Sequence, residues 1–234
     1  MVKPGNIKVF SFDFGGTLAY ETTDDHIIFQ EVLKELGYSF NQSEIKEAMK
    51  HARAWWEHEK DKRIWNENAL KDFHKRMLSY LKLPNPEKLA MQTSKILPSK
   101  LDFKAYSDVE QTLQRLKEEG YTLIITSNVS SRRNLETYMK KAGLRHYFEI
   151  LVASGSIGYE KPNPQIFVEA AKMAKVKCKE IVHVGDVYEI DYLGAESAGA
   201  TGVLIDRKGK YVNKKCRKIS DLTQLIELLN EINF

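Results

Sequence analysis

Short apolar runs, each closed by a small or acidic residue, recur along the chain. They cover residues 7–12, 121–125, 149–153, 181–184 and 201–205. Runs of this length that are rich in isoleucine and valine are typical of strands buried on both faces. The pattern therefore predicts a set of short, fully buried strands.

Amphipathic helical patterns separate these runs. Apolar positions recur three and four residues apart in about 109–116, 135–142, 166–174 and 192–198, and a last short strand precedes a helix over 222–232. Strand–helix alternation implies right-handed crossovers, so we expect an α/β fold with a doubly wound, Rossmann-like parallel sheet. Functional sites in such sheets lie at the carboxyl ends of the strands.

One long stretch breaks this alternation. From about residue 19 to 103 there is no convincing strand, and helical patterns cover roughly 25–36, 43–60, 67–81 and 86–97, with Pro84, Pro86 and Pro98 as helix breakers. We therefore predict an α-helical domain over 19–103, inserted after the first strand of a core domain made of 1–18 and 104–234.

Composition narrows the class of protein. The 234 residues carry a net charge of +4, which is too small a surplus to argue for nucleic acid as a partner. No run approaches the roughly 18 apolar residues of a membrane span, and the first residues show no signal-peptide pattern. The only cysteines, Cys178 and Cys216, form no CxxC motif. We expect a cytoplasmic globular protein, a monomer or homodimer, with no membrane or nucleic-acid partner.

The first strand ends in an acidic, glycine-rich turn. Asp13 follows the strand, and Gly15, Gly16 and Thr17 come next. Glycines let backbone N–H groups turn toward a bound anion, and a carboxylate at a strand end requires a partner charge. The alternative is an aspartate that only caps a tight turn.

Two further strand ends carry polar groups. Ser127 and Asn128 close the second predicted strand, although serine and asparagine are also ordinary turn residues. Lys161 precedes a Pro-x-Pro turn that opens a helix. Because prolines fix the backbone around it, this lysine suits a positioned ammonium group, whereas most loop lysines are only solvated charges.

The fourth predicted strand ends in acidic residues. Asp186 closes the strand and Asp191 follows five residues later, with Glu189 between them. Carboxylates gathered from two strand ends form a hard-oxygen site suited to Mg²⁺. The simpler interpretation is that Asp191 caps the next helix and Asp186 shapes the turn.

Taken together, these strand ends resemble the four motifs of the haloacid dehalogenase (HAD) superfamily, over essentially the whole chain. Asp13 matches the family nucleophile, Ser127 the hydroxyl of the second motif, and Lys161 the lysine of the third. Asp186 and Asp191 match the acidic fourth motif. The predicted helical insert looks like the type I cap of this family, which closes over the site and selects substrates.

The resemblance implies a hydrolase. In phosphatases of the family the residue matching Asp13 attacks phosphorus and forms an aspartyl-phosphate. The implied cofactor is Mg²⁺ and the implied partner a small phosphorylated metabolite. Asp191 is implied to orient Lys161 or a metal-bound water. The implied metal ligands are Asp13, the Gly15 carbonyl and Asp186, and the implied phosphate-binding residues are Gly16, Thr17, Ser127, Asn128 and Lys161.

The chain departs from the phosphatase motif at one position. That motif reads Asp-x-Asp-x-Thr, but Gly15 stands where the second aspartate acts as general acid and base. Such a group contributes about 10²–10⁴ in rate. Three alternatives to an ordinary phosphatase follow: an L-2-haloacid dehalogenase-type hydrolase, a phosphonatase that uses a lysine of the insert, and a weak or inactive domain that binds a phosphorylated ligand or a partner.

Two further stretches carry unusual side chains. Residues 51–65 combine Trp55, Trp56 and Trp65 with basic neighbours, which allows a substrate-reading patch. We favour one tryptophan packed inward with the charges solvated on a helix. The basic run 207–218 is interpreted as a solvated loop.

Overall fold

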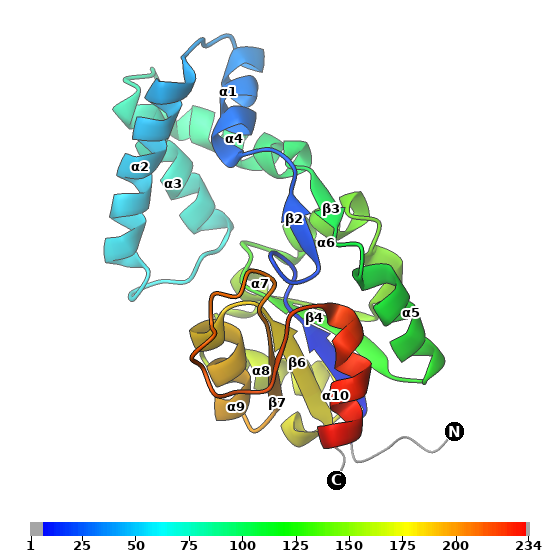
Figure 1. Cartoon of the computed structure of the whole chain (residues 1–234). Coiled ribbons are helices and arrows are strands. Elements are labelled where there is room, and N and C mark those ends of the chain that lie inside the picture. The colour runs from blue at the N-terminus through cyan, green and yellow to red at the C-terminus, as the bar shows by residue number, and fades with distance from the viewer. Residues whose placement is uncertain (1–6, 233–234) are drawn as a thin grey trace.

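The computed structural model describes residues 7–232, with side chains through Leu228. Its core is a six-stranded sheet in the order β5-β4-β1-β6-β7-β8, and every neighbouring pair of strands is parallel (Figure 1). The predicted doubly wound fold is confirmed. The strands are β1 (Val9–Phe12), β4 (Thr122–Ser127), β5 (Ile150–Ala153), β6 (Ile181–Gly185), β7 (Thr201–Ile205) and β8 (Lys218–Ile219).

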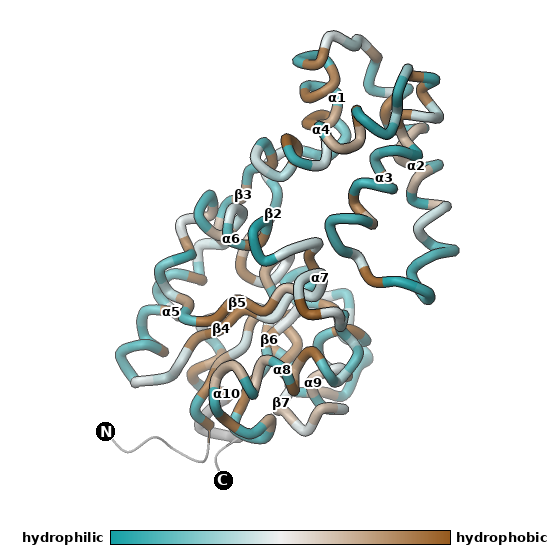
Figure 2. Tube along the Cα trace, turned by 180° about the vertical axis from the view of Figure 1, so that it is seen from behind, coloured by the Kyte–Doolittle hydropathy of each residue, from teal (hydrophilic) through white to brown (hydrophobic). Residues whose placement is uncertain are grey.

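Helices cover both faces of this sheet. Phe10 and Phe12 of β1 belong to a core cluster with helices α5 and α6, whereas Val9 packs on the other face with α8. This alternation makes the strands apolar on both sides, as the hydrophobic traces of β4 and β5 in Figure 2 illustrate. The core helices are α5 (Val109–Glu118), α6 (Arg132–Lys141), α7 (Ser154–Ile157), α8 (Gln165–Ala174), α9 (Leu193–Ser197) and α10 (Leu225–Ile232).

Four helices between β2 (Ala19–Glu21) and β3 (Phe103–Ala105) form a separate bundle, which we call the helical insert. It consists of α1 (Asp25–Glu35), α2 (Gln42–Glu59), α3 (Glu67–Tyr80) and α4 (Pro86–Lys100). Asn41 caps α2 with a capping box, and Asn66 caps α3. Within residues 7–232 no helix is both long and apolar enough to cross a membrane.

One expected helix end is wrong. Pro98 was expected to end the last helix of the insert, yet α4 runs through it to Lys100. A proline this close to a helix end removes only one backbone hydrogen bond, and the Pro98 side chain is buried there.

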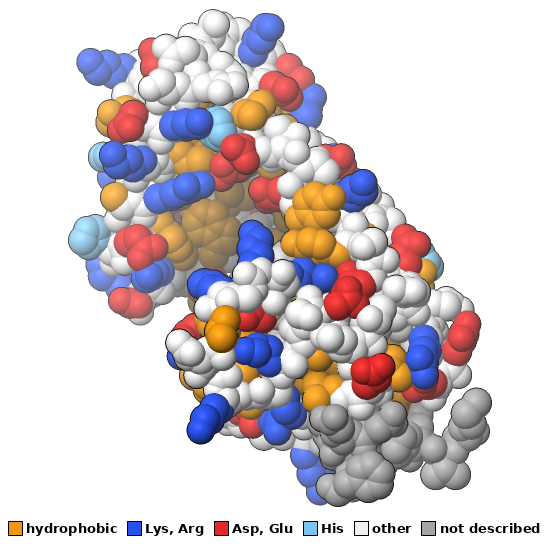
Figure 3. Space-filling view, viewed as in Figure 1, with side chains coloured by type: hydrophobic (Ala, Val, Ile, Leu, Met, Phe, Trp, Pro, Cys, Tyr) orange, Lys and Arg blue, Asp and Glu red, His pale blue; other side chains and the backbone are white. Residues whose placement is uncertain are grey.

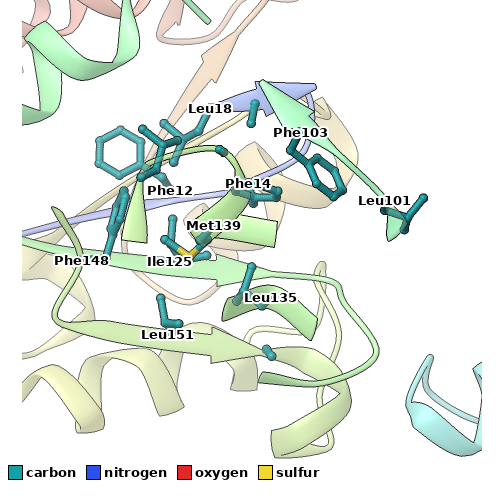
Figure 4. Close-up of a cluster of buried hydrophobic side chains, with 14 of the residues drawn as sticks. Phe12, Phe14, Leu18, Leu101, Phe103, Ile125, Leu135, Met139, Phe148 and Leu151 are labelled. Atoms are coloured by element: carbon teal, nitrogen blue, oxygen red, sulfur yellow. The ribbon is translucent and has the colours of Figure 1, made fainter. Parts of the chain in front are cut away.

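The expectation of no strand between 19 and 103 is also wrong. β2 (Ala19–Glu21) and β3 (Phe103–Ala105) pair antiparallel where the chain enters and leaves the helical insert. Strands of three residues are too short to show a hydrophobic period, so pairing across the insert creates them. Figure 4 shows Phe14 and Phe103 beside Phe12 and Ile125 of the sheet, which anchors both ends of the insert on the core.

Candidate active site

The polar residues singled out in the sequence gather at the carboxyl edge of the sheet. Asp13 directly follows β1, Ser127 ends β4, and Asp186 directly follows β6. β1 lies between β4 and β6, so residues from distant parts of the chain become neighbours. Lys161 reaches the same place from the loop between α7 and α8.

Lys161 is the centre of a buried network. Its Nζ lies 2.6 Å from Asp13 Oδ1 and 2.6 Å from Asp191 Oδ1, and its side chain is 1% exposed. Ser127 Oγ donates a 2.9 Å hydrogen bond to the same Asp13 oxygen. The network therefore brings together the four predicted catalytic positions, namely Asp13, Ser127, Lys161 and Asp191.

The two ion pairs set the charges of this network. Burial lowers the pKa of Lys161, but the two facing carboxylates outweigh it and leave the pKa above its usual value. Burial likewise raises the pKa of Asp191, but Lys161 and His183 hold it below its ordinary range. Lys161 is therefore a fixed cation and Asp191 a fixed anion.

Asp186 lies over the glycine turn. A Cβ built on Gly16 would stand 2.5 Å from Asp186 Oδ2, and the Gly16 φ of +79° is a conformation that favours glycine. Thr17 Oγ1 donates to Asp186 Oδ1 at 3.4 Å. Burial, followed by repulsion from Asp13 and Asp191, raises the pKa of Asp186 to about 6. This carboxylate therefore lacks a full compensating charge.

The donor set fits a hard divalent cation. Three carboxylates, those of Asp13, Asp186 and Asp191, lie near the ammonium group of Lys161, which is paired only with Asp13 and Asp191. Carboxylate and carbonyl oxygens are the ligands that Mg²⁺ prefers. Within residues 7–232 no three His, Cys, Asp or Glu side chains are arranged as a metal cluster. The predicted set differs from such a cluster because it combines two carboxylates with the Gly15 carbonyl.

Three of the predicted phosphate-binding groups have partners inside the protein. The Gly16 N–H donates to the Ala19 carbonyl, and the Thr17 hydroxyl is directed at Asp186. The Asn128 amide bonds twice to the Lys161 backbone, accepting from its N–H at 2.8 Å and donating to its carbonyl at 2.9 Å. These groups hold the turn and Lys161 in place, which leaves Ser127 and Lys161 as the side chains facing Asp13.

A buried polar row behind the network was not recognised in the sequence. Ser11 Oγ donates to Thr126 Oγ1 at 2.8 Å and lies 2.9 Å from His183 Nδ1, while His183 Nε2 lies 3.3 Å from Asp191 Oδ1. All three newly found side chains are fully buried, and burial lowers the pKa of His183. The only signal was a polar residue inside each of three apolar strands.

Arg207 was also not recognised as part of the site. Its guanidinium donates to Asp108 at 2.8 Å and to the Thr17 carbonyl at 2.8 Å, which fixes the far side of the glycine turn. It opens the basic run interpreted as a solvated loop. The rest of that run does precede a short strand, β8, and α10, as expected.

A cavity of about 410 Å³ lies between the helical insert and the core, and Figure 3 shows a hollow there with hydrophobic side chains inside it. Trp56, Trp65, Phe73 and Phe29 line it from the insert, and Tyr138 lines it from the core. Its core wall also includes Asn128, Val129 and Ser130, which follow Ser127 directly. The cavity therefore adjoins the network around Asp13.

The expectation that one tryptophan packs inward is wrong, because Trp55, Trp56 and Trp65 are all half-buried. Trp65 is fixed on the core, since its backbone N–H donates to Glu160 Oε1 at 2.6 Å. Trp55 lies outside the cavity, with the guanidinium of Arg76 5.3 Å from its ring centre.

The chain belongs to the haloacid dehalogenase-like hydrolase family, whose profile matches residues 7–199. The predicted family is confirmed, and with it the class of hydrolases. The fold is also similar over nearly its whole length to solved structures. A 2-haloacid dehalogenase from Pseudomonas syringae matches with a TM-score of 0.75 at 22% identity, covering 97% of this chain and 99% of that one. At that identity the likeness concerns the fold alone.

Other relatives are phosphatases by name. A HAD phosphatase from Thermococcus onnurineus matches with a TM-score of 0.66 at 25% identity, covering 95% of this chain and 98% of that one. A glyceraldehyde 3-phosphate phosphatase from Methanopyrus kandleri is 40% identical over 51% of this chain and 50% of its own. A ribulose-1,5-bisphosphate 5-phosphatase from Halopiger xanaduensis is 32% identical over 42% of this chain and 41% of its own. The chain thus spans about half the length, or less, of these curated relatives.

Proposed function

We propose that this chain is a Mg²⁺-dependent phosphatase of small phosphorylated molecules that works through an aspartyl-phosphate on Asp13. The observation that carries the proposal is the buried triad of Asp13, Ser127 and Lys161, in which both partners approach one Asp13 oxygen, at 2.9 and 2.6 Å. This leaves the other carboxylate oxygen available for attack on phosphorus. The relatives named as phosphatases support the same reaction class.

The residues of the chain take distinct parts in this proposal. While Asp13 attacks, the Ser127 hydroxyl and the Lys161 ammonium group donate hydrogen bonds to the phosphoryl oxygens. Asp191 keeps Lys161 charged and aimed, and Asn128 fixes the Lys161 backbone. Asp191 and Asn128 are therefore positioning residues.

Asp13, the Gly15 carbonyl and Asp186 are the proposed Mg²⁺ ligands. When bound, this ion supplies charge that offsets the repulsion between carboxylates and a phosphate dianion. The uncompensated charge of Asp186 supports this assignment.

The wider setting is part of the same proposal. Residues 19–103 act as the cap that covers the site, and residues 1–18 with 104–234 carry the chemistry. Cys178 and Cys216 are both free thiols, which fits a reducing cytoplasm. We expect a monomer or homodimer.

The test is phosphate release from 4-nitrophenyl phosphate with Mg²⁺ and with EDTA, for the wild type and Asp13→Asn. Turnover that requires Mg²⁺ and disappears in Asp13→Asn supports the proposal. Turnover that survives Asp13→Asn contradicts it, because another group would then be the nucleophile.

A dehalogenase is the second candidate, because one arginine, Arg53, lines the apolar cavity and provides a partner for a substrate carboxylate. Arg53 is, however, paired with Asp25 at 3.0 Å, and Asp186 is retained. Halide release from 2-chloropropionate that is insensitive to EDTA and lost in Arg53→Ala would favour this candidate.

A further inference from the structure

Resting on the proposed phosphatase function, we infer that the natural substrates are aryl phosphates, whose leaving group is a phenol-like apolar ring held in the cavity between the helical insert and the core. Two independent features of the chain carry this inference. One is the chemistry of the cavity wall, and the other is the lack of an acid beside the leaving oxygen.

The cavity wall offers aromatic surface. Trp56 and Trp65 meet edge to face with ring centres 4.7 Å apart, and Trp65 meets Phe73 in the same way at 5.5 Å. Met77, Leu97 and other aliphatic side chains complete the wall. Rings prefer edge-to-face and offset contacts with other rings, so an aromatic ligand gains more here than its buried area alone provides.

The polar side chains in the wall already have partners. His74 Nδ1 lies 2.9 Å from Thr93 Oγ1, and Ser130 Oγ accepts from Asn134 Nδ2 at 2.9 Å. Asn128 is bonded twice to the Lys161 backbone. A leaving group with several hydroxyls would lose its water and find these groups occupied, which disfavours sugar-like substrates.

The charged groups of the wall disfavour a second anion. Glu21 and Asp25 contribute two carboxylates, and Arg53 is paired with Asp25. The pKa of Glu21 is raised by burial and then by repulsion from Asp25 and Asp24, which reflects a locally negative field. A neutral leaving group fits this wall better than one with its own carboxylate.

Among the residues that the structure describes, no side chain takes the place of the aspartate that Gly15 replaces. A Cβ at Gly15 would have no atom within 4 Å, so no neighbouring side chain fills the place of the usual aspartate. Burial lowers the pKa of His74 to about 3 and raises the pKa of Tyr138 far above its usual value, so neither group transfers protons near neutral pH. Glu21 also lines the cavity and is therefore tested below as an alternative acid.

An aryl phosphate needs no such acid. Asp13 forms the new oxygen–phosphorus bond, the bond between phosphorus and the aryl oxygen breaks, and its electron pair leaves on a phenolate. Phenols have pKa values of about 10, so the phenolate departs without a proton and takes one from water later. Water then attacks the phosphorus of the aspartyl-phosphate, which restores the Asp13 carboxylate and releases dihydrogen phosphate with both water protons.

The first experiment compares phenyl phosphate with benzyl phosphate, two substrates of similar shape whose leaving groups are a phenolate and an alkoxide. We expect kcat/KM of the wild type to be at least about 100-fold higher for phenyl phosphate, and Gly15→Asp to raise the benzyl value by a similar factor. Since kcat/KM reports the step up to aryl or alkyl departure, the later attack of water does not enter. Equal kcat/KM values for the two substrates in the wild type overturn the inference. Loss of benzyl phosphate cleavage in Glu21→Gln would then identify Glu21 as the acid.

The second experiment tests the ring. Benzyl and glycerol phosphate both release alkoxides, so their comparison isolates the apolar contact, and we expect a KM roughly tenfold lower for benzyl phosphate. Trp56→Ala should remove that advantage, whereas Trp55→Ala, its neighbour outside the cavity, should retain it. Equal KM values, or equal effects of the two substitutions, contradict the assignment of the ring to this cavity.

The experiments distinguish failure of the proposed function from failure of the inference about the leaving group. If 4-nitrophenyl phosphate is not cleaved, or is cleaved by Asp13→Asn, the proposed function fails. If it is cleaved by Asp13 but phenyl and benzyl phosphate are equivalent, only the inference about the leaving group fails. Thermal unfolding of each variant confirms that the fold is intact.

Discussion

At the carboxyl edge of the sheet, polar side chains are bonded to one another, whereas in the neighbouring cavity the side chains meet mainly through aromatic rings. Around Lys161, ion pairs of 2.6 Å fix both partners in place. Around Trp65, ring centres lie 4.7 to 5.5 Å apart. The edge therefore holds one geometry, and the cavity tolerates ligands that differ in shape.

The two regions therefore have different roles. Charge-assisted hydrogen bonds are directional and strong, so they suit the step that is common to all substrates. Apolar contacts are not directional and scale with area, so they suit selection among leaving groups. We expect substitutions at the edge to affect all substrates alike and substitutions in the cavity to change the preference among them.

The largest effect should follow from removing the central cation. Lys161→Met leaves Asp13 and Asp191 buried without a partner charge, so we expect the free energy of unfolding to fall by about 3–5 kcal/mol and phosphate release to stop. Urea unfolding measures the first effect. Lys172→Met on α8 removes a mostly exposed pair with Glu169 and should lower stability far less. Equal costs for the two variants would contradict the central role of Lys161.

The next effect is a pH dependence of stability that arises in the helical insert and not at the carboxyl edge of the sheet. His74 has a pKa of about 3 in the fold, against 6.5 for an ordinary histidine. Because the unfolded chain then binds more protons below 6.5, His74 contributes full stability above that pH and loses it as the pH falls toward 3.

At about pH 4.5 this loss amounts to roughly 3 kcal/mol, at about 1.4 kcal/mol per pH unit. The measurement is the urea midpoint of the wild type and His74→Gln between about pH 7 and 4.5. The variant should show a flatter pH dependence, while His58→Gln on the exposed side of α2 should match the wild type. A wild-type slope in His74→Gln would exclude this histidine as the cause.

A smaller effect should show that Asn128 belongs to the edge although it also lines the cavity. Asn128→Ala removes two hydrogen bonds to the Lys161 backbone, so we expect about 2 kcal/mol lower stability. Because Lys161 is then less well placed, kcat should fall by the same factor for phenyl and benzyl phosphate. A change in the ratio of the two substrates would instead assign Asn128 to the selection of the leaving group.

The smallest effect should come from the start of α2. Asn41→Ala breaks the capping box with Glu44 and should lower stability by about 1 kcal/mol. Asn41 lines no part of the cavity, so kcat and KM should stay unchanged for both substrates. A changed substrate preference would mean that the position of the whole insert, rather than its wall, controls selection.

The predicted elements followed from patterns longer than a few residues. The sequence predicted the strands around Asp13 and the helices near Lys161, because buried runs and amphipathic periods are local properties. β2 and β3 were missed because three residues carry no period, and each strand exists only through its partner across the helical insert. The end of α4 was missed because the cost of Pro98 depends on its distance from the helix end.

The residues of the candidate site were likewise predicted only in part from the sequence. The sequence pointed to Asp13, Ser127 and Asp186 because each closes an apolar run, and to Lys161 and Asp191 because they follow such runs in the order of the family motifs. It missed His183 and Ser11, whose pairing depends on the register of β1 against β6. Nor does any local pattern reveal that the Asn128 amide binds the Lys161 backbone 33 residues away.

The sequence by itself determined the family, the order of strands and helices, and the set of charged residues at the strand ends, because strand patterns and motifs are written in neighbouring residues. Only the tertiary structure decided which of these groups face Asp13 and which are hydrogen-bonded to other parts of the chain. It also decided that two tryptophans line a cavity beside them. Those outcomes depend on strand register and on how the insert packs on the core, and both are set by contacts between residues far apart in the chain.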